Sequence, residues 1–256
     1  MDLLTILGIV GAIGAILLGQ FLEGGHAGSL VQLTAFIIVI GGTLGACMVA
    51  FPKAEFMRGM KLVGTTFKAK PSDLGELSAK LVELATLARR EGVLSLEGKI
   101  AELSDPFLKR GLQLVVDGVD PGVTRETLEV AIFMEFEENN AGAKVWESAG
   151  GFAPTVGILG AVLGLIHVME NLDDPTKLGP GIAVAFVATV YGVGSANLFF
   201  LPFATKMKRN GAAEKERKTL IAEGLLSIQE GLSPRIIEEK LKSFAGSHAH
   251  HGEEKK

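Results

Sequence analysis

Cysteine, tryptophan and tyrosine each occur once in the 256 residues of this chain, and long stretches contain no charged side chain. The single cysteine, Cys47, excludes a disulfide framework. No nucleophile with a matching base, no paired catalytic acids and no metal-ligand set is recognisable, so we expect neither an enzyme nor a metal or cofactor site. The 25 basic and 29 acidic residues form no basic stripe of the kind that binds nucleic acid.

Charge-free stretches give the chain a positive mean hydropathy of +0.36. Two of them are Leu3–Leu22 and Leu30–Phe51; two more lie between Glu147 and Glu170 and between Lys177 and Lys206. Each is long enough to cross a ~30 Å hydrocarbon core as a helix. A signal peptide is the alternative for the first stretch, but it lacks a basic start and a cleavage site. The sequence therefore predicts an all-α polytopic membrane protein with four transmembrane helices and a helical cytoplasmic module.

The basic residues predict how the chain is oriented. Of the Lys and Arg residues, 13 lie between Pro52 and Ala149, 11 lie from Lys206 to the end, and one, Lys177, lies in the loop between the third and fourth spans. Because cytoplasmic segments near membrane spans are enriched in Lys and Arg, we expect both termini to be cytoplasmic.

The expected organisation has four parts. Residues 1–52 form a transmembrane hairpin, 53–148 a cytoplasmic helical module, 149–205 a second transmembrane hairpin, and 206–256 cytoplasmic helices with a disordered tail. Apolar periodicity and turn signals predict further helices. These are Asp73–Arg90, Ser95–Leu103, Pro106–Val116, a helix that Thr124 caps and that runs into the third span, a helix to about Glu230, and Arg235–Phe244 with Ser233 as its cap.

The third and fourth spans are rich in small residues, which let helices approach closely. Their polar groups are sparse, and none is a carboxylate. Proton pathways through membranes usually depend on Asp, Glu or His. If the chain conducts ions, we expect a partner to supply the carboxylate.

An ordered set of local strings resembles the MotA/PomA family of flagellar stator subunits, within the wider class that includes ExbB and TolQ. The likeness covers nearly the whole chain. The strings are ARREGVLSLE (88–97), APTVGILGAVLGL (153–165), LDDPTKLGPGIAVAFVATVYG (172–192), FLPFATKMK (200–208) and GLSPRIIEEKL (231–241).

The resemblance implies a function and a set of partners. It implies a homopentamer, in the bacterial inner membrane, around a dimer of a single-span MotB/PomB-type subunit whose aspartate takes and releases the ion. Ion flow through this stator would rotate the ring and exert torque on the rotor switch-complex protein. One charge moving down ~100 mV releases about 2.3 kcal/mol, so each ion drives a modest step.

The resemblance also assigns roles to charged residues of the cytoplasmic module. Arg89 or Arg90, together with Glu97, match family positions that engage oppositely charged groups on the rotor. Without the resemblance, these residues would read as the solvated end of a helix.

Five further residues match family positions in the ion pathway. Pro154 and Pro202 match prolines at the cytoplasmic ends of the third and fourth spans, where a kink could couple protonation to movement. Ala161 stands where sodium-type members carry a threonine, whereas Thr189 matches a threonine that both types share. The resemblance therefore favours a proton over a sodium ion, although Thr155 could offer an oxygen of its own.

Three alternatives remain open from sequence. An ExbB/TolQ-like energiser of envelope processes shares the second hairpin, but that group has three spans. A self-contained channel or transporter would need an acid of its own inside the membrane. An enzyme is the weakest alternative, for the reasons given above.

Overall fold

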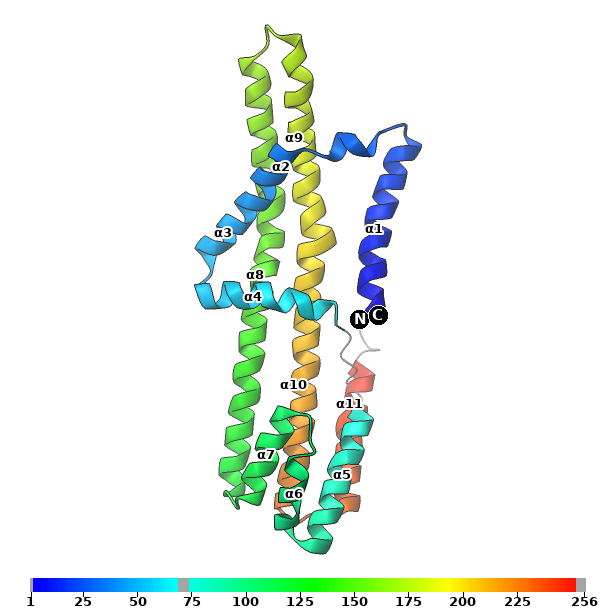
Figure 1. Cartoon of the computed structure of the whole chain (residues 1–256), viewed down its shortest axis with the longest axis vertical. Helices are drawn as coiled ribbons and strands as arrows, with labels where there is room; N and C mark the ends of the chain where they lie inside the picture. The colour runs from blue at the N-terminus through cyan, green and yellow to red at the C-terminus, as the bar shows by residue number, and fades with distance from the viewer. Residues whose placement is uncertain (1, 69–73, 252–256) are drawn as a thin grey trace. The chain divides into compact units, whose positions relative to one another are not determined.

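The computed structural model describes residues 2–68 and 74–251, and every regular element in these ranges is a helix (Figure 1). Four helices are long and apolar enough to span a membrane. They are Leu3–Leu22, Leu33–Ala50, and the apolar parts of Pro121–Glu170 and Leu178–Gln229. The predicted fold class is confirmed.

Contacts between residues divide the chain into two units. Unit 1 contains Met1–Ala69 and Glu138–Asn210, and unit 2 contains Lys70–Glu137 and Gly211–Lys256. Each unit is thus assembled from two separate segments of the chain. We describe each unit by itself.

In unit 1, the first hairpin begins with α1, which Asp2 caps by accepting a hydrogen bond from the amide of Leu4 at 3.1 Å. No residue of α1 is buried. The second span is one apolar stretch with a π-helical segment in its middle. The elements are α1 (Leu3–Leu22), η1 (Ala27–Leu30), α2 (Leu33–Phe36), η2 (Ile37–Gly41) and α3 (Gly42–Ala50).

Unit 1 also includes α4 (Lys53–Thr66), which the sequence-based boundaries placed in the cytoplasmic module. Its position has a packing cause. Gly59 of α4 meets Gly142 at a crossing so close that a Cβ on Gly59 would lie 2.8 Å from the Gly142 carbonyl oxygen. The indole of Trp146 secures the crossing with a hydrogen bond of 2.9 Å to the carbonyl of Gly59.

Two long helical segments contribute to both units. One is α8 (Pro121–Glu170), and the other is the sequence α9 (Pro175–Ser195), η4 (Ala196–Phe200) and α10 (Leu201–Gln229). The helix predicted to run into the third span is present, but its predicted cap is wrong. Asp120, not Thr124, accepts from the first free amides, at 2.8 Å from Gly122, because Pro121 already begins the helix.

Unit 2 is a helical module around a leucine-rich core. Its other elements are α5 (Leu74–Glu91), η3 (Val93–Leu96), α6 (Glu97–Ile100), α7 (Pro106–Val116) and α11 (Pro234–His251). The core residues with the largest buried side chains are Leu81, Leu96, Leu112, Leu128, Leu220, Ile221, Leu225, Ile237 and Leu241.

Most helices of unit 2 follow the sequence prediction, with two differences. The stretch predicted as one helix, Ser95–Leu103, is divided into η3 and α6. α11 continues to His251, beyond its predicted end at Phe244, since no proline interrupts the intervening residues. The tail was predicted to be disordered, and its last residues, 252–256, lie outside the described ranges.

Candidate functional sites

Glycines bring the third and fourth spans into close contact. A Cβ on Gly157 of α8 would lie 2.9 Å from the Ala188 carbonyl oxygen, and one on Gly192 of α9 would lie 2.6 Å from the Ala153 carbonyl oxygen. About two helical turns after Gly157, a Cβ on Gly164 would lie 2.8 Å from the Ala185 nitrogen. These neighbours are backbone atoms that cannot rotate away. Only glycine therefore permits this approach, and we call the contact the glycine seam.

Pro154 lies inside α8, and the helix continues through it. Proline has no amide hydrogen, so the carbonyl of Gly150 loses the partner that an ordinary residue at position 154 would provide. The proline side chain is half-buried, and the preceding Gly150 and Gly151 carry no side chain that could crowd the ring. The third span thus has a local weakness in its backbone hydrogen bonding at Pro154.

Pro202 lies at a second irregular point. It is the second residue of α10, two positions after the end of η4, a π-helical segment. A π-helical segment absorbs an extra residue without breaking the helix, and such segments occur often at functional sites. The missing amide of Pro202 is accommodated where the hydrogen-bond pattern has already changed. Both predicted coupling prolines therefore coincide with altered backbone bonding inside continuous helices.

The candidate ion-pathway hydroxyls bond within their own helices. Thr155 Oγ1 donates to the Phe152 carbonyl at 2.8 Å, and Thr189 Oγ1 donates to the Ala185 carbonyl at 3.3 Å. Thr155 is exposed, whereas Ala161 and Thr189 are half-buried beside the glycine seam. Thr155 lies six residues before Ala161, which puts the two on different faces of α8. The structure does not bring Thr155 and Ala161 together.

The uncovered faces of these two helices are largely apolar. They carry Leu159, Val162 and Ile166 on α8, and Phe186, Val190 and Val193 on α9. None of the described residues within the two spans, between Glu147 and Glu170 and between Lys177 and Lys206, is an Asp or Glu. A transferable proton therefore has no carboxylate of this chain along these spans.

Tyr191, one of the few polar residues of the fourth span, has a structural role. Its hydroxyl donates to the Leu30 carbonyl at 2.6 Å and accepts from the Gln32 amide at 3.2 Å. Its ring also meets that of Phe36 edge-on. Tyr191 thus fixes the start of the second span against α9. The sequence could not predict this role. The partners of the tyrosine hydroxyl are backbone atoms 159 and 161 residues away, and backbone atoms are the same in every residue.

A second contact that sequence reasoning missed ties down the N-terminus. The ammonium of Lys206 bonds both the Asp2 carboxylate and the Thr5 hydroxyl. The bond from Lys206 lowers the pKa of the Asp2 carboxyl from its ordinary value of 3.8. The Asp2 amide donates to the Phe67 carbonyl at 2.9 Å. These contacts hold one end of α1, a helix with no buried residue.

In unit 2, the predicted rotor-contact residues lie around one turn. Arg89 and Arg90 are in the last turn of α5, and Glu97 begins α6. Gly92, with a φ of +87°, makes the turn that ends α5. All three charged side chains are exposed, and between them Leu94 is 73% exposed, a high value for a leucine outside a membrane. Charges of both signs thus surround an exposed apolar side chain.

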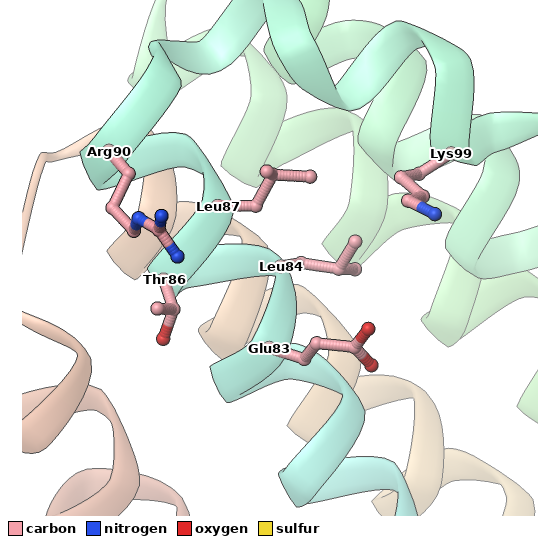
Figure 2. Close-up of a pocket in the computed structure, with 6 residues that line it drawn as sticks. All are labelled: Glu83, Leu84, Thr86, Leu87, Arg90 and Lys99. Carbon is pink, nitrogen blue, oxygen red and sulfur yellow. The ribbon is translucent and has the colours of Figure 1, made fainter.

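A pocket of about 370 Å³ adjoins this turn. Figure 2 shows Leu84 and Leu87 of α5 between Arg90 on one side and Lys99 of α6 on the other, with Glu83 nearby. A hydrogen bond from Lys99 to Glu102, at 2.9 Å, raises the pKa of the Lys99 ammonium and keeps it charged. The arrangement can receive an apolar side chain flanked by an acidic one.

Ion pairs stabilise unit 2 near this pocket. Arg217 bonds Asp105 and also Glu214, the latter at 2.8 Å, and all three side chains are less than a quarter exposed. Burial alone raises the pKa of Asp105, but the Leu108 amide and the Arg217 guanidinium outweigh it and hold this pKa below 3.8. Among the described residues, no group of His, Cys, Asp and Glu could hold a metal ion.

Comparisons with known proteins match this architecture. Residues 99–219 match the profile of the MotA/TolQ/ExbB proton channel family, and residues 6–92 match that of the motility protein A N-terminal region. Motility protein A of Helicobacter pylori is 40% identical over 244 residues, and the match covers 95% of each chain. Chemotaxis protein PomA of Vibrio alginolyticus is 36% identical, again over 95% of each chain.

Solved structures agree with the sequence comparison. A chain in the structure of C. jejuni MotAB superposes with a TM-score of 0.90 at 36% identity, covering 95% of this chain and 96% of that chain. A chain in the flagellar MotAB stator complex from Bacillus subtilis gives a TM-score of 0.85 at 37% identity, covering 93% and 94%. The ExbB/TolQ-like alternative is not favoured. This chain belongs to the MotA/TolQ/ExbB proton channel family and, within it, to the MotA/PomA group of flagellar motor stator subunits.

Proposed function

We propose that this stator subunit surrounds a MotB/PomB-type dimer as a homopentamer and turns ion flow into rotation of the ring. The observation that carries the proposal is the pairing of two features in the second hairpin. The glycine seam makes α8 and α9 a closely packed pair, while their uncovered apolar faces have no carboxylate. A ring of such pairs provides a wall for the ion pathway, and the partner's aspartate provides the group that takes and releases the ion.

The transported ion is a proton in this proposal. The support for a proton is Ala161, which offers no oxygen ligand where sodium-type members carry a threonine. A sodium ion needs oxygens that replace its hydration shell, whereas a proton needs only an acceptor. No metal ion or other cofactor takes part, and the chain performs no enzymatic reaction of its own.

The turn between α5 and α6 contacts the rotor. Arg89, Arg90 and Glu97 provide exposed charges of both signs for complementary groups on the rotor switch-complex protein. Charges at the rim of an interface govern orientation and the rate of encounter more than affinity. This suits a contact that must form and break at every step of rotation.

The complex lies in the bacterial inner membrane, with both termini of this chain cytoplasmic. The distribution of basic residues supports this orientation. Of the Lys and Arg residues, 13 lie between Pro52 and Ala149 and 11 lie from Lys206 to the end, and Lys and Arg are enriched on the cytoplasmic side of membrane spans. The rotor-contact turn is then on the same side as the rotor.

Motility in a strain that lacks this gene tests the proposal. Complementation with the wild-type gene should restore swimming. Arg89→Glu plus Arg90→Glu, or Glu97→Lys, should abolish swimming while membrane expression and complex formation persist. Normal swimming of every charge-reversal variant would contradict the rotor contact, and normal swimming of the deletion strain would contradict the role in flagellar rotation.

The ion is tested separately, by measuring swimming speed while the sodium concentration is varied at constant ionic strength. We expect speed to be independent of sodium and to fall when a protonophore collapses the proton gradient. A speed that follows the sodium concentration would contradict the proton assignment and leave the rotor assignment intact.

A further inference from the structure

Helix α4 has one face packed against the rest of unit 1. Phe56, Met60 and Val63 pack against the apolar cluster that contains Trp146, and Gly59 makes the backbone crossing with Gly142. This face fixes the rotation of α4 about its own axis. The side chains on the opposite face are consequently held away from the protein.

One flank of α4 is also occupied. Arg58 forms an ion pair with Glu138 and a hydrogen bond of 3.2 Å with the Asn139 side chain. Lys206 and Lys208 form further ion pairs among the described residues of unit 1. The remaining basic residues of α4 take no part in an ion pair with any residue the structure describes.

Those remaining basic residues share the outward face. Lys53, Lys61 and Lys68 are exposed, and we call them the lysine face. Positions 53, 57, 61, 64 and 68 lie close to one line on a helix with 3.6 residues per turn, although Lys68 follows the last helical residue, Thr66. Two of these positions, Met57 and Gly64, are uncharged, and no acidic residue occurs on the line. The side chains of Lys53 and Lys61 therefore leave α4 from the same side with no carboxylate between them, and the exposed Lys68 follows just after the helix.

The location of α4 indicates which kind of molecule these ammonium groups can bind. α4 starts three residues after α3 ends at Ala50, and α3 completes the second span. Within unit 1, α4 runs across α8, and α3 slopes down to it at an oblique angle (Figure 1). An amphipathic helix that follows a span this closely and keeps a basic outward face is suited to the membrane interface, at the level of the lipid headgroups.

We propose that the lysine face binds the phosphate groups of anionic phospholipids in the leaflet next to α4. A lysine ammonium on its flexible stem binds phosphate well, and each Lys near an anionic membrane surface contributes about fivefold in affinity. Met57, which is 45% exposed, lies between Lys53 and Lys61 and can contact the upper acyl chains. The interaction would anchor the stator subunit in its membrane independently of the ion and the rotor contact.

Spin-labelled lipids test this in the full complex. The complex is reconstituted in phosphatidylcholine bilayers with a trace of spin-labelled phosphatidylglycerol or spin-labelled phosphatidylcholine, and the motionally restricted fraction of each label is measured. We expect the protein to prefer phosphatidylglycerol about fivefold, and we expect Lys53→Gln, Lys61→Gln and Lys68→Gln together to remove most of that preference.

A matched control removes the same charge elsewhere. Lys80→Gln, Lys109→Gln and Lys242→Gln together neutralise three lysines of unit 2 and should leave the lipid preference unchanged. The charge-retaining set Lys53→Arg, Lys61→Arg and Lys68→Arg should also keep it. An unchanged preference in the glutamine variant of the lysine face would overturn the proposal, and would leave an acidic surface of a neighbouring copy as the partner.

A second measurement needs no variant. The wild-type preference should fall as the salt concentration is raised from 0.01 M to 1 M, because the Debye length shrinks from about 30 Å to about 3 Å. A preference that does not change with salt, or no preference at any salt concentration, would also overturn the proposal, even if the glutamine variant failed to assemble.

Discussion

The two units of this chain are stabilised by different means. In unit 1, the third and fourth spans meet through glycines whose backbones nearly touch. In unit 2, leucine and isoleucine side chains fill a core, and half-buried ion pairs such as Arg217 with Asp105 and Glu214 surround it. Lipid is as apolar as leucine, so burying leucine gains little inside a membrane, whereas close backbone packing gains much. In water, the hydrophobic effect makes the burial of leucine side chains the larger source of stability.

The substitution with the largest expected effect disrupts the core of unit 2. Leu225 is fully buried, and its Cδ1 lies against Gly111. We expect Leu225→Ala to lower the free energy of unfolding of unit 2 by about 3 to 4 kcal/mol. Hydrogen exchange of the full-length complex should show faster exchange in α5, α7 and α11 and little change in α9. Leu94→Ala, at an exposed position, is the control, and equal effects of the two variants would contradict the assignment of the core.

The second prediction adds a methyl group at the glycine seam, where the previous one removed side-chain atoms from a core. In Gly192→Ala the new methyl group would lie 2.6 Å from the Ala153 carbonyl oxygen and 2.9 Å from the Cα of Gly157, so a helix must shift. We expect a loss of about 2 to 3 kcal/mol, seen as faster exchange in α9 and as reduced swimming. Gly194→Ala, in the same helix, meets nothing within 4 Å and should behave as wild type. Similar effects of both substitutions would show that the seam is not the cause.

An intermediate effect is expected at the ion pairs of unit 2. Arg217→Met removes the partner of Asp105 and Glu214, and we expect a loss of about 2 kcal/mol at neutral pH. The pKa of Asp105 is lowered by folding, so its contribution is present above pH 3.8 and is lost as the pH falls through the lower pKa of the folded state.

This pH dependence gives the ion-pair prediction its control. Acid should destabilise unit 2 of the wild type below about pH 4, and it should do so less in Arg217→Met, in which one cause of the lowered pKa has been removed. Exchange rates measured from pH 6 down to pH 3 decide this. Parallel profiles for the two proteins would exclude Arg217 as the source of the acid sensitivity.

The smallest expected effect comes from a single polar contact in unit 1. Tyr191→Phe removes the hydroxyl that bonds the Leu30 carbonyl and the Gln32 amide. We expect a loss of about 1 kcal/mol, confined to the start of the second span. Exchange at residues 30 to 36 should quicken while α9 keeps its wild-type rate. If the whole of α9 loosens instead, the hydroxyl supports more than one local contact.

Apolar periodicity and charge counts were sufficient for the spans and for most helices. α1, α5 and α7 agree with the prediction because each has its stop signal nearby, such as Gly92 after α5. Bonds between distant residues could not be predicted in this way. Tyr191 with Leu30, Trp146 with Gly59, and Lys206 with Asp2 join positions 87 to 204 residues apart, and their acceptors include backbone atoms that carry no sequence signal.

The candidate sites were located by resemblance, and the structure adds their physical setting. Arg89, Arg90 and Glu97 proved to be exposed around one glycine turn. Pro154 and Pro202 lie within continuous helices, which proline content alone would not have indicated. The roles of Thr155, Ala161 and Thr189 in ion selection stay predictions.

The bond between Lys206 and Asp2 bears on how the protein is made. The two residues are 204 positions apart, and α1 has no buried residue. α1 is synthesised before the fourth span, and the lysine that ties its end to that span is synthesised only after it. Until then the end of α1 has only contacts within the first 68 residues, such as the bond from the Asp2 amide to the Phe67 carbonyl. The bond to Lys206 completes the attachment once the fourth span is present.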